Sequence, residues 1–220
     1  MAITNIFIMK TKYKEITFYI YDGMNSIERN IKRFIDILLS LIALILFSPL
    51  FIICFFAVKY SDGGDAIFKQ ERIGRFGRPF YIYKFRSMRM DAEKDGPQLY
   101  RHEKDNRLTA VGHFLRTHHL DELPQLWNVL VGDMSFIGPR PERKYYIDQI
   151  MKHDNRYTFL YQVRPGVTSY ATLYNGYTDT MEKMLKRLEL DLYYLEHRSL
   201  WFDFKILIKT FYNIVFGKKF

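Results

Sequence analysis

The chain has a single cysteine among its 220 residues, Cys54, and this scarcity excludes an intrachain disulfide. The absence of disulfides is consistent with a reducing compartment or with a fold that needs no covalent cross-link. Three signatures are also missing: the phosphate-binding loop of P-loop nucleotidases, the glycine fingerprint of dinucleotide-binding folds and the nucleophile elbow of α/β hydrolases. The first 30 residues lack the compact apolar stretch and small-residue cleavage site of a secretory signal. The chain therefore lacks the most familiar sequence motifs for nucleotide binding and for ester hydrolysis.

Positive charge is in excess, because 33 lysines and arginines face 24 aspartates and glutamates, a formal net charge of +9. Such an excess favours an anionic partner, which could be nucleic acid, an acidic membrane surface or a phosphorylated ligand. Aromatic residues make up 17% of the chain, and Tyr and Trp commonly lie where apolar surface meets water. The composition therefore indicates that the protein acts on an anionic partner or at a membrane surface.

Charge is nearly absent from residues 34–58, which contain one charged side chain, Asp36. A straight helix of this length would reach about 37 Å, enough for a hydrocarbon core of about 30 Å. Pro49 removes a backbone hydrogen bond, so we expect a kink there, and Ser48 can bond to one of the freed carbonyls. The two arms, about 21 and 14 Å long, are each too short to span a bilayer alone.

Two topologies fit this segment. Lys32 and Arg33 precede it and Lys59 follows it, so the positive-inside tendency is satisfied at both ends only if both face the cytoplasm. A helix that enters the membrane, breaks at Ser48 and Pro49 and returns agrees better with these flanks. An ordinary kinked transmembrane helix is the alternative, since prolines occur in such helices.

A basic strand follows the apolar segment. The alternation from Phe80 to Tyr83 predicts a strand, which a turn rich in Gly and Arg at residues 74–79 precedes. Lys84 and Arg86 at the end of this strand add to the cations of the turn. The sequence thus predicts a short strand region that carries positive charge.

The stretch HHLDELPQLWNVL places two adjacent carboxylates, Asp121 and Glu122, just before Pro124. Proline is tolerated in the first turn of a helix, so we expect a helix to begin between residues 121 and 123. A helix start favours phosphate, and one or two carboxylates together with substrate phosphates commonly hold Mg²⁺. An aspartate can also form an acyl-phosphate intermediate. Simple capping by acidic residues is the alternative explanation.

Three arginines are placed as candidate phosphate ligands. Arg116 precedes Asp121 by five residues, Arg140 stands between two prolines, and Arg164 precedes another proline. A guanidinium pairs with phosphate oxygens in a bidentate manner, and flanking prolines reduce the cost of ordering it. Structural ion pairs or solvent exposure are the alternatives for each arginine taken singly.

Three histidines near the dyad could suggest a metal centre. The spacing of His113, His118 and His119 matches no zinc signature, and no cysteine lies near them. We therefore expect no zinc site.

Two helices are expected at the C-terminal end. Apolar residues recur at helical spacing after Thr180 and predict an amphipathic helix. Residues 199–220 predict a second helix, which combines aromatic residues with Lys205, Lys209, Lys218 and Lys219. That composition fits a helix in the headgroup plane of a membrane, and packing against the core is the alternative.

Five segments follow one another in a distinctive order: KRFIDILLSLIALILFSPLF, ERIGRFGRPFYIYKFRSM, LRTHHLDELPQLWNVLVGDMSFIGPRPE, RPGVTS and LDLYYLEHRSLWFDFKILIKT. Through them, residues 30–210 resemble the bacterial sugar transferases, the monotopic phosphoglycosyl transferases that begin glycan assembly on a polyprenol phosphate. The resemblance is to the minimal form, without the large multi-helix N-terminal extension of some relatives.

The resemblance implies transfer of a phospho-sugar from a UDP-sugar to undecaprenyl phosphate, with release of UMP and use of Mg²⁺. It implies ping-pong kinetics through a phospho-sugar intermediate on Asp121, with Glu122 assisting the metal or the acceptor, so that both carboxylates serve the metal. Arg116 and Arg140 would bind substrate phosphates, and Lys84 and Arg86, on the same active face, would also bind the substrate. The step would be the first membrane step in making an exopolysaccharide, capsule, O-antigen or glycoprotein glycan.

The resemblance also implies an architecture and a location. Residues 1–29 would be an arm of unknown role, residues 30–60 a re-entrant membrane helix broken at Ser48 and Pro49, and residues 61–220 a catalytic domain with C-terminal interfacial helices. The fold class is α+β and mostly helical. The domain would lie on the cytoplasmic face of the bacterial inner membrane, in contact with its lipid and without a nucleic-acid partner, and the aromatic C-terminal helix could mediate a homodimer.

The sequence departs from the family pattern in two places. THHLDE stands where a run like TSLDE is common, so His118 and His119 are unusual neighbours of the dyad, and RPGVTSYATLYNGY replaces RPGITGLAQVNG. The donor sugar and the glycan pathway therefore stay open. The competing function is a basic, membrane-anchored module that holds anionic lipid or nucleic acid without turnover. The competing topology is a bitopic protein with an extracytoplasmic domain.

Overall fold

A computed structural model describes residues 9–10, 15–16, 21–94, 96, 105–176 and 178–216. Most of the predicted N-terminal arm, part of the polar stretch before residue 105, and Lys218 and Lys219 lie outside the described residues. Within the arm, Met9–Lys10 (β1) and Glu15–Ile16 (β2) pair antiparallel. The described part is mostly helical with three two-stranded sheets, which confirms the predicted α+β class.

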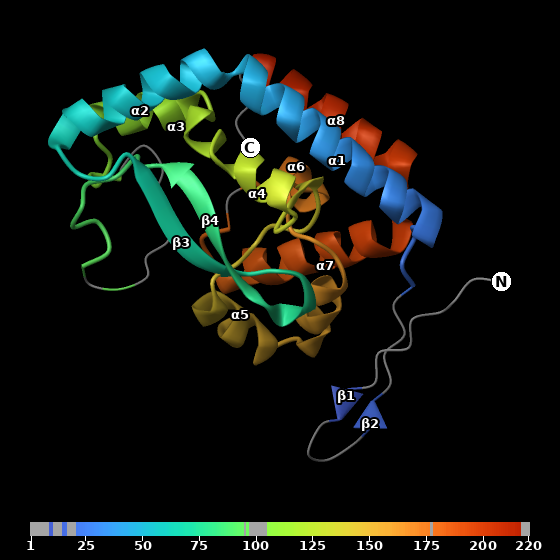
Figure 1. The fold of residues 1–220 in the computed structure, drawn as a ribbon. Coiled ribbons are helices and arrows are strands. Elements are labelled where there is room, and N and C mark those ends of the chain that lie inside the picture. Colours follow the sequence, from blue (N-terminus) through green and yellow to red (C-terminus); the bar gives the residue numbers. More distant parts are fainter. Residues whose placement is uncertain are drawn as a thin grey trace.

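Two helices form an arch along one side of the molecule, α1 (Ser26–Leu46) and α2 (Ser48–Asp62), and they meet at a bend of 65° (Figure 1). Pro49 lies in the first turn of α2, where its missing N–H costs no helical hydrogen bond. Ser48 Oγ donates to the carbonyl of Ile45 at 2.8 Å, so the predicted break and the predicted back-bond are both confirmed. No single helix in the described residues is long and apolar enough to cross a bilayer, whereas the bent pair together meets both criteria.

The inner and outer faces of the arch differ sharply. On α2, Cys54 and Val58 pack against Phe85 in a buried apolar cluster. On α1, the buried residues are polar, Asp36 and Ser40, and Asp36 Oδ1 accepts a hydrogen bond from the backbone N–H of Phe136 at 3.1 Å. The outer face is apolar and exposed, with side chains that include Ile27, Phe34, Ile45, Leu46, Ile52, Ile53 and Phe56.

A β-hairpin connects the arch to the rest of the molecule. Its strands β3 (Ile67–Ile73) and β4 (Pro79–Phe85) are antiparallel and pair from Ile67 opposite Phe85 to Ile73 opposite Pro79. The predicted strand at residues 80–83 lies within β4 and is confirmed. A 3-10 turn, η1 (Arg75–Gly77), joins the two strands. Between the hairpin and the C-terminal helices lie α3 (Ala110–Thr117), the 3-10 turn η3 (Leu120–Glu122), α4 (Gln125–Val131), β5 (Ser135–Ile137), α5 (Lys144–Met151), the 3-10 segment η4 (Asn155–Gln162), β6 (Gly166–Thr168) and α6 (Tyr170–Asn175). Strands β5 and β6 are parallel.

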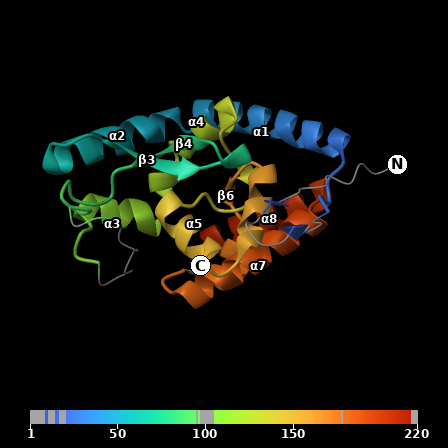
Figure 2. The same ribbon diagram turned by 90° about the horizontal axis from the view of Figure 1, so that it is seen from below.

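The two predicted C-terminal helices are present as α7 (Met181–His197) and α8 (Leu200–Val215). Figure 2 shows α7 on the side of the molecule opposite α1 and α2. The apolar face of α7 is buried in the core cluster with α5 and η4, so its amphipathic spacing reflects core packing and not a membrane-facing surface. On α8, by contrast, Trp201, Phe204, Ile208 and Phe211 remain exposed. Only α8 of the two therefore keeps an apolar face that an interface could use.

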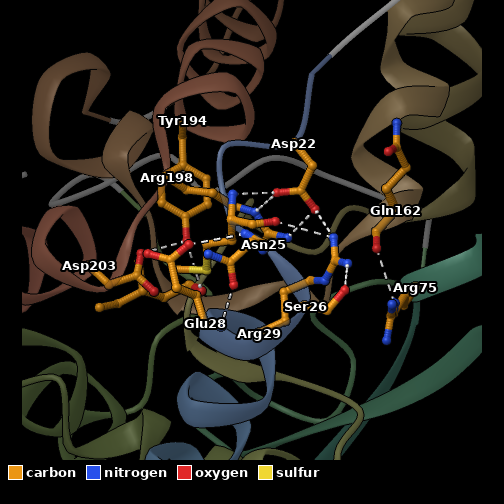
Figure 3. A network of polar contacts seen from close by, with 12 residues as sticks. Asp22, Asn25, Ser26, Glu28, Arg29, Arg75, Gln162, Tyr194, Arg198 and Asp203 are labelled. Carbon is orange, nitrogen blue, oxygen red and sulfur yellow. Dashed lines mark hydrogen bonds and ion pairs between the residues drawn. The ribbon is translucent and has the colours of Figure 1, made fainter. Parts of the chain in front are cut away.

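Polar contacts tie the start of α1 to the junction of α7 and α8 (Figure 3). Asp22 accepts hydrogen bonds from Arg198 at 2.6 and 2.7 Å and from Arg29 at 2.9 Å. Asp203 accepts from the Tyr194 hydroxyl at 2.7 Å on one oxygen and from Lys32 Nζ, on α1, at 2.5 Å on the other. The N-terminal end of the arch is thus fixed to the globular body.

Candidate active site

The two carboxylates of the predicted dyad lie in η3, the short turn that joins α3 to α4. The helix start expected near residues 121–123 falls on this 3-10 helix, and the α-helix α4 begins only at Gln125, after Pro124. The physical reason lies upstream, where His119 adopts a left-handed backbone with φ 55° and redirects the chain. The N–H of Leu123 then closes a 3-10 turn on the carbonyl of Leu120 at 3.2 Å. The dyad is therefore presented by a tight turn just before the helix.

Asp121 is buried, with 4% of its surface exposed. Burial raises the pKa of its carboxyl, and the neighbouring Glu122 adds to the rise, while Lys84 and Arg116 oppose it. Arg116 Nε lies 3.9 Å from Asp121 Oδ2 and also donates to Ser87 Oγ at 3.0 Å. Asp121 is thus a desolvated carboxylate, and an approaching positive charge stabilises its ionised form.

Glu122 has the opposite electrostatic balance. Its Oε1 accepts a hydrogen bond from Lys84 Nζ on β4 at 2.7 Å. Burial alone would raise the pKa of Glu122, but the charges of Lys84 and Arg140 and the hydrogen bond from Lys84 outweigh it and lower the pKa to about 2. Adjacent carboxyls whose pKa values are pushed apart are typical of sites where the two groups have different tasks.

Arg140 supplies a further positive charge next to Glu122. Its backbone lies between Pro139 and Pro141, in the loop after β5. Within the described residues its guanidinium makes no hydrogen bond or ion pair, so its donors are available to a ligand. The structure therefore brings together Lys84, Arg116, Arg140, Asp121 and Glu122.

Two of the residues predicted to bind substrate are engaged elsewhere. Arg86 is buried, pairs with Asp62 at the end of α2 and donates to Met90 Sδ at 2.8 Å. Arg164 Nε donates to the carbonyl of Gly132 at 2.9 Å, beyond the end of α4 that is farther from the dyad. In this arrangement Arg86 secures the C-terminal end of the arch and Arg164 caps α4.

Three further residues support the site and were not predicted. Ser87 holds Arg116, as described above. Asn128 on α4 accepts from the Tyr83 N–H at 3.1 Å and donates to the Tyr81 carbonyl at 2.8 Å, which fixes α4 against the strand that carries Lys84. Gln125 is buried one turn after Asp121, and its Nε2 has no partner in the described structure. No local pattern marks these residues, because their partners lie on other elements.

The dyad also provides the donor set for a divalent cation. No group of three His, Cys, Asp or Glu side chains suited to a metal occurs in the described parts of the chain. Two adjacent carboxylates nevertheless match the mode in which Mg²⁺ binds to one or two protein carboxylates and completes its shell with water and substrate phosphates. The residues present therefore fit Mg²⁺ better than a metal that needs a closed protein cage.

Comparison with known proteins gives one family and several relatives. A family model described as bacterial sugar transferase matches residues 27–217. The chain is 42% identical, over 187 residues, to a UDP-N-acetylgalactosamine-undecaprenyl-phosphate N-acetylgalactosaminephosphotransferase of Aeromonas hydrophila, covering 85% of this chain and 44% of the relative. It is 42% identical, over 197 residues, to a UDP-glucose:undecaprenyl-phosphate glucose-1-phosphate transferase of Escherichia coli, covering 88% of this chain and 42% of the relative.

Another relative is matched over more of its length. A UDP-glucose:undecaprenyl-phosphate glucose-1-phosphate transferase of Caulobacter vibrioides is 40% identical over 182 residues, which are 81% of this chain and 67% of the relative. The chain spans about two fifths of the length of the Aeromonas and Escherichia relatives. The matched portion includes the dyad, the loop of Arg140 and both helices of the arch.

Proposed function

Because the chain belongs to the bacterial sugar transferase family, we propose that it transfers a sugar phosphate from a UDP-sugar to undecaprenyl phosphate. The products are UMP and a polyprenyl diphospho-sugar. Relatives are named for N-acetylgalactosamine phosphate, glucose phosphate and galactose phosphate, so the donor sugar of this chain is left open. The observation that carries the proposal is the buried Asp121 and its partner Glu122 beside Lys84, Arg116 and Arg140.

The electrostatics support a ping-pong route through a covalent intermediate. A carboxylate oxygen of Asp121 attacks the phosphorus that carries the sugar, and the bond to the bridging oxygen breaks, so UMP leaves with the bonding electrons. A phosphate oxygen of the lipid then attacks the same phosphorus, and Asp121 is regenerated as a carboxylate. Charge builds up on the phosphate oxygens in both steps, and Arg116 and Arg140 are close enough to the dyad to stabilise it.

We propose that Asp121 and Glu122 would hold Mg²⁺ together with the phosphates of the donor. When bound, the ion supplies positive charge that offsets the charge of the diphosphate. Glu122 stays ionised through its bond to Lys84, which keeps it able to accept a cation. Asp121 stays in a desolvated position where its negative charge is poorly hydrated and therefore more reactive.

We further propose that the arch enters one leaflet and returns, with the catalytic body on the cytoplasmic face. Both ends of the arch are bound to the same body, through Lys32 and Asp203 at one end and Asp62 and Arg86 at the other. A straight span would separate those ends by the hydrocarbon core of about 30 Å. The exposed apolar outer face of α1 and α2 and the buried polar residues Asp36 and Ser40 support the same placement.

The test is turnover by the purified chain. We expect UMP to be released from one member of a panel of UDP-sugars when undecaprenyl phosphate and Mg²⁺ are present. Asp121→Asn should abolish release, and mass spectrometry of the wild-type chain incubated with donor alone should find a phospho-sugar on Asp121. The absence of UMP with every donor, or full activity in Asp121→Asn, would overturn the proposal. A noncatalytic binding module would retain lipid and release nothing.

A further inference from the structure

Three arginines on separate parts of the fold have no ion pair within the described residues: Arg33 on α1, Arg75 in the hairpin turn and Arg164 in the loop before β6. Each is half-buried, and each donates to a backbone carbonyl. Arg33 donates to two of them, those of Val129 and Leu130, at 2.6 and 2.8 Å. A guanidinium has five N–H donors, so these contacts leave donors of all three arginines unused.

Arg33 and Arg164 meet at the C-terminal end of α4. Arg164 Nε donates to the carbonyl of Gly132 at 2.9 Å, directly after the turn whose carbonyls bind Arg33. A Cβ atom built on Gly132 would lie 3.1 Å from Arg33 Nη2 and 3.9 Å from Arg164 Nε. The two guanidinium groups therefore border the same small space beside Gly132, although they come from α1 and from the loop before β6.

Arg75 lies next to the loop that carries Arg164. Its Nε donates to the carbonyl of Gln162 at 3.0 Å, two residues before Arg164 in the chain (Figure 3). The ring of Phe76 lies against the same guanidinium, with its centroid 4.5 Å from Arg75 Cζ. The hairpin turn thus holds a third cation in place through one carbonyl and one aromatic ring.

Negative charge near these arginines is already engaged. Burial lowers the pKa of Arg164, and the charges of Arg75 and Arg33 lower it further, while Asp36 opposes them. The carboxylate of Asp36 accepts the backbone N–H of Phe136 and makes no ion pair in the described structure. The three cations therefore repel one another, and an anion bound among them would remove that repulsion.

The position of Arg33 relates this cluster to the arch. Arg33 is the last cation before the apolar residues 34–58, and the next side chain, Phe34, is 65% exposed on the outer face. Basic side chains that immediately precede a membrane segment commonly bind the headgroups of acidic lipids. An anion held by Arg33 would thus lie where the arch leaves the body.

We propose that Arg33, Arg75 and Arg164 form an anion-binding site that takes a phosphate group. Guanidinium groups suit phosphate because their planar N–H forks pair with its oxygens. The phosphate has two possible sources, the phosphodiester of an acidic phospholipid or a free phosphate. The site goes beyond the proposed function, since it lies at the end of α4 farther from the dyad and no step of the transfer requires it.

The test is a calorimetric titration of the full chain in a nonionic detergent with two probes, a short-chain phosphatidylglycerol and inorganic phosphate. Arg75→Gln removes one cation and leaves both caps of α4 in place. The double variant Arg75→Gln with Arg164→Gln removes two. Its charge-matched control is Lys152→Gln with Lys186→Gln, because both lysines are exposed and lie outside the cluster. The melting temperature of each variant shows whether it remains folded.

We expect the wild type to bind phosphatidylglycerol saturably, Arg75→Gln to weaken the affinity by about tenfold, and the double variant to weaken it further. The control should bind as the wild type does. Equal binding of inorganic phosphate, lost in the same variants, would identify the phosphate group itself as the ligand, whereas binding of the lipid alone would identify the headgroup. No saturable binding by the wild type, unchanged binding in the double variant, or an equal loss in the control would overturn the inference.

The titration does not depend on turnover, so its outcome is separate from that of the proposed function. A phosphate ion that binds beside Arg140 at the dyad would be insensitive to the double variant and would count against the site. A chain that binds phosphatidylglycerol through the cluster but releases no UMP would refute only the transfer reaction. A chain that releases UMP and binds neither probe would refute only the anion site.

Discussion

Lys84 Nζ on β4 lies 2.7 Å from Glu122 Oε1 in the turn before α4, and both side chains are largely buried. This contact joins two segments that are 38 residues apart in the chain. It holds Glu122 ionised, since the charge and hydrogen bond of Lys84 contribute to lowering its pKa to about 2 against the opposing effect of burial. The pair therefore links the strand region to the dyad both mechanically and electrostatically.

Removing this lysine should damage activity more than stability. Lys84→Met leaves Glu122 without its cation, and an unpaired buried carboxylate costs about 1–3 kcal/mol of unfolding free energy. The loss of positive charge at the dyad should lower kcat/KM for UMP release by about a hundredfold, as for one stabilising donor at a site of charge development. The double variant Lys84→Met with Glu122→Gln should recover stability but not activity. Recovery of both would show that the pair is only structural.

The dyad and the break at Pro49 could be predicted because both follow local rules. Proline in a long apolar helix forces a bend, and adjacent carboxylates before a proline fall in a turn or a helix start. The same rules placed the dyad in the wrong kind of turn, because the left-handed backbone of His119 is not encoded by a glycine. The local sequence thus predicted where the site lies but not the backbone conformation of the turn that carries it.

The contacts of Arg86 and Arg164 could not be predicted from the local sequence. Both are arginines in basic or proline-flanked stretches, a pattern shared with Arg140. Their partners are Asp62 at the end of α2 and the carbonyl of Gly132, and only the tertiary fold brings these groups together. The apolar spacing of α7 likewise does not distinguish a membrane face from a core face, and the presence of α5 and η4 decides it.

Asp191 should make the stability of the protein depend on pH. It is buried on α7, one of its oxygens has no partner in the described structure, and burial raises its pKa to about 8 against the opposing charge of Arg187. The unfolded chain loses this proton near pH 4, whereas the folded chain keeps it until about pH 8. The stabilising contribution is therefore complete below pH 4 and is lost as the pH rises to about 8.

Asp191→Asn removes this dependence, because the amide stays neutral. We expect the variant to be more stable than the wild type at pH 8.5, by on the order of 5 kcal/mol, and to differ little near pH 4. Urea unfolding at a series of pH values measures the difference. Asp148→Asn, which changes an exposed carboxylate on α5, serves as the control and should not alter the slope. A constant difference between wild type and Asp191→Asn at all pH values would contradict the prediction.

The proposed topology can be tested with single cysteines at the two ends of the arch. Asn30 and Ser61 are both exposed, and the native Cys54 is buried, so the wild-type chain provides the blank. We expect Asn30→Cys and Ser61→Cys to react with a membrane-impermeant maleimide in inside-out vesicles and to be protected in spheroplasts. Labelling from opposite sides would establish a straight span instead.

The contact between Lys32 and Asp203 should determine how firmly α1 is held to the body. Lys32 Nζ and Asp203 Oδ2 are 2.5 Å apart and both side chains are mostly buried, while the second oxygen of Asp203 accepts from Tyr194. Lys32→Met leaves a buried carboxylate with one partner, so we expect a loss of about 2–4 kcal/mol of unfolding free energy. The neutralised pair, Lys32→Met with Asp203→Asn, should regain more than half of that loss, because no unpaired charge remains. Hydrogen exchange of the first turns of α1 reports the detachment directly, and protection equal to the wild type in Lys32→Met would show that Arg198 and Asp22 alone are sufficient to hold the helix.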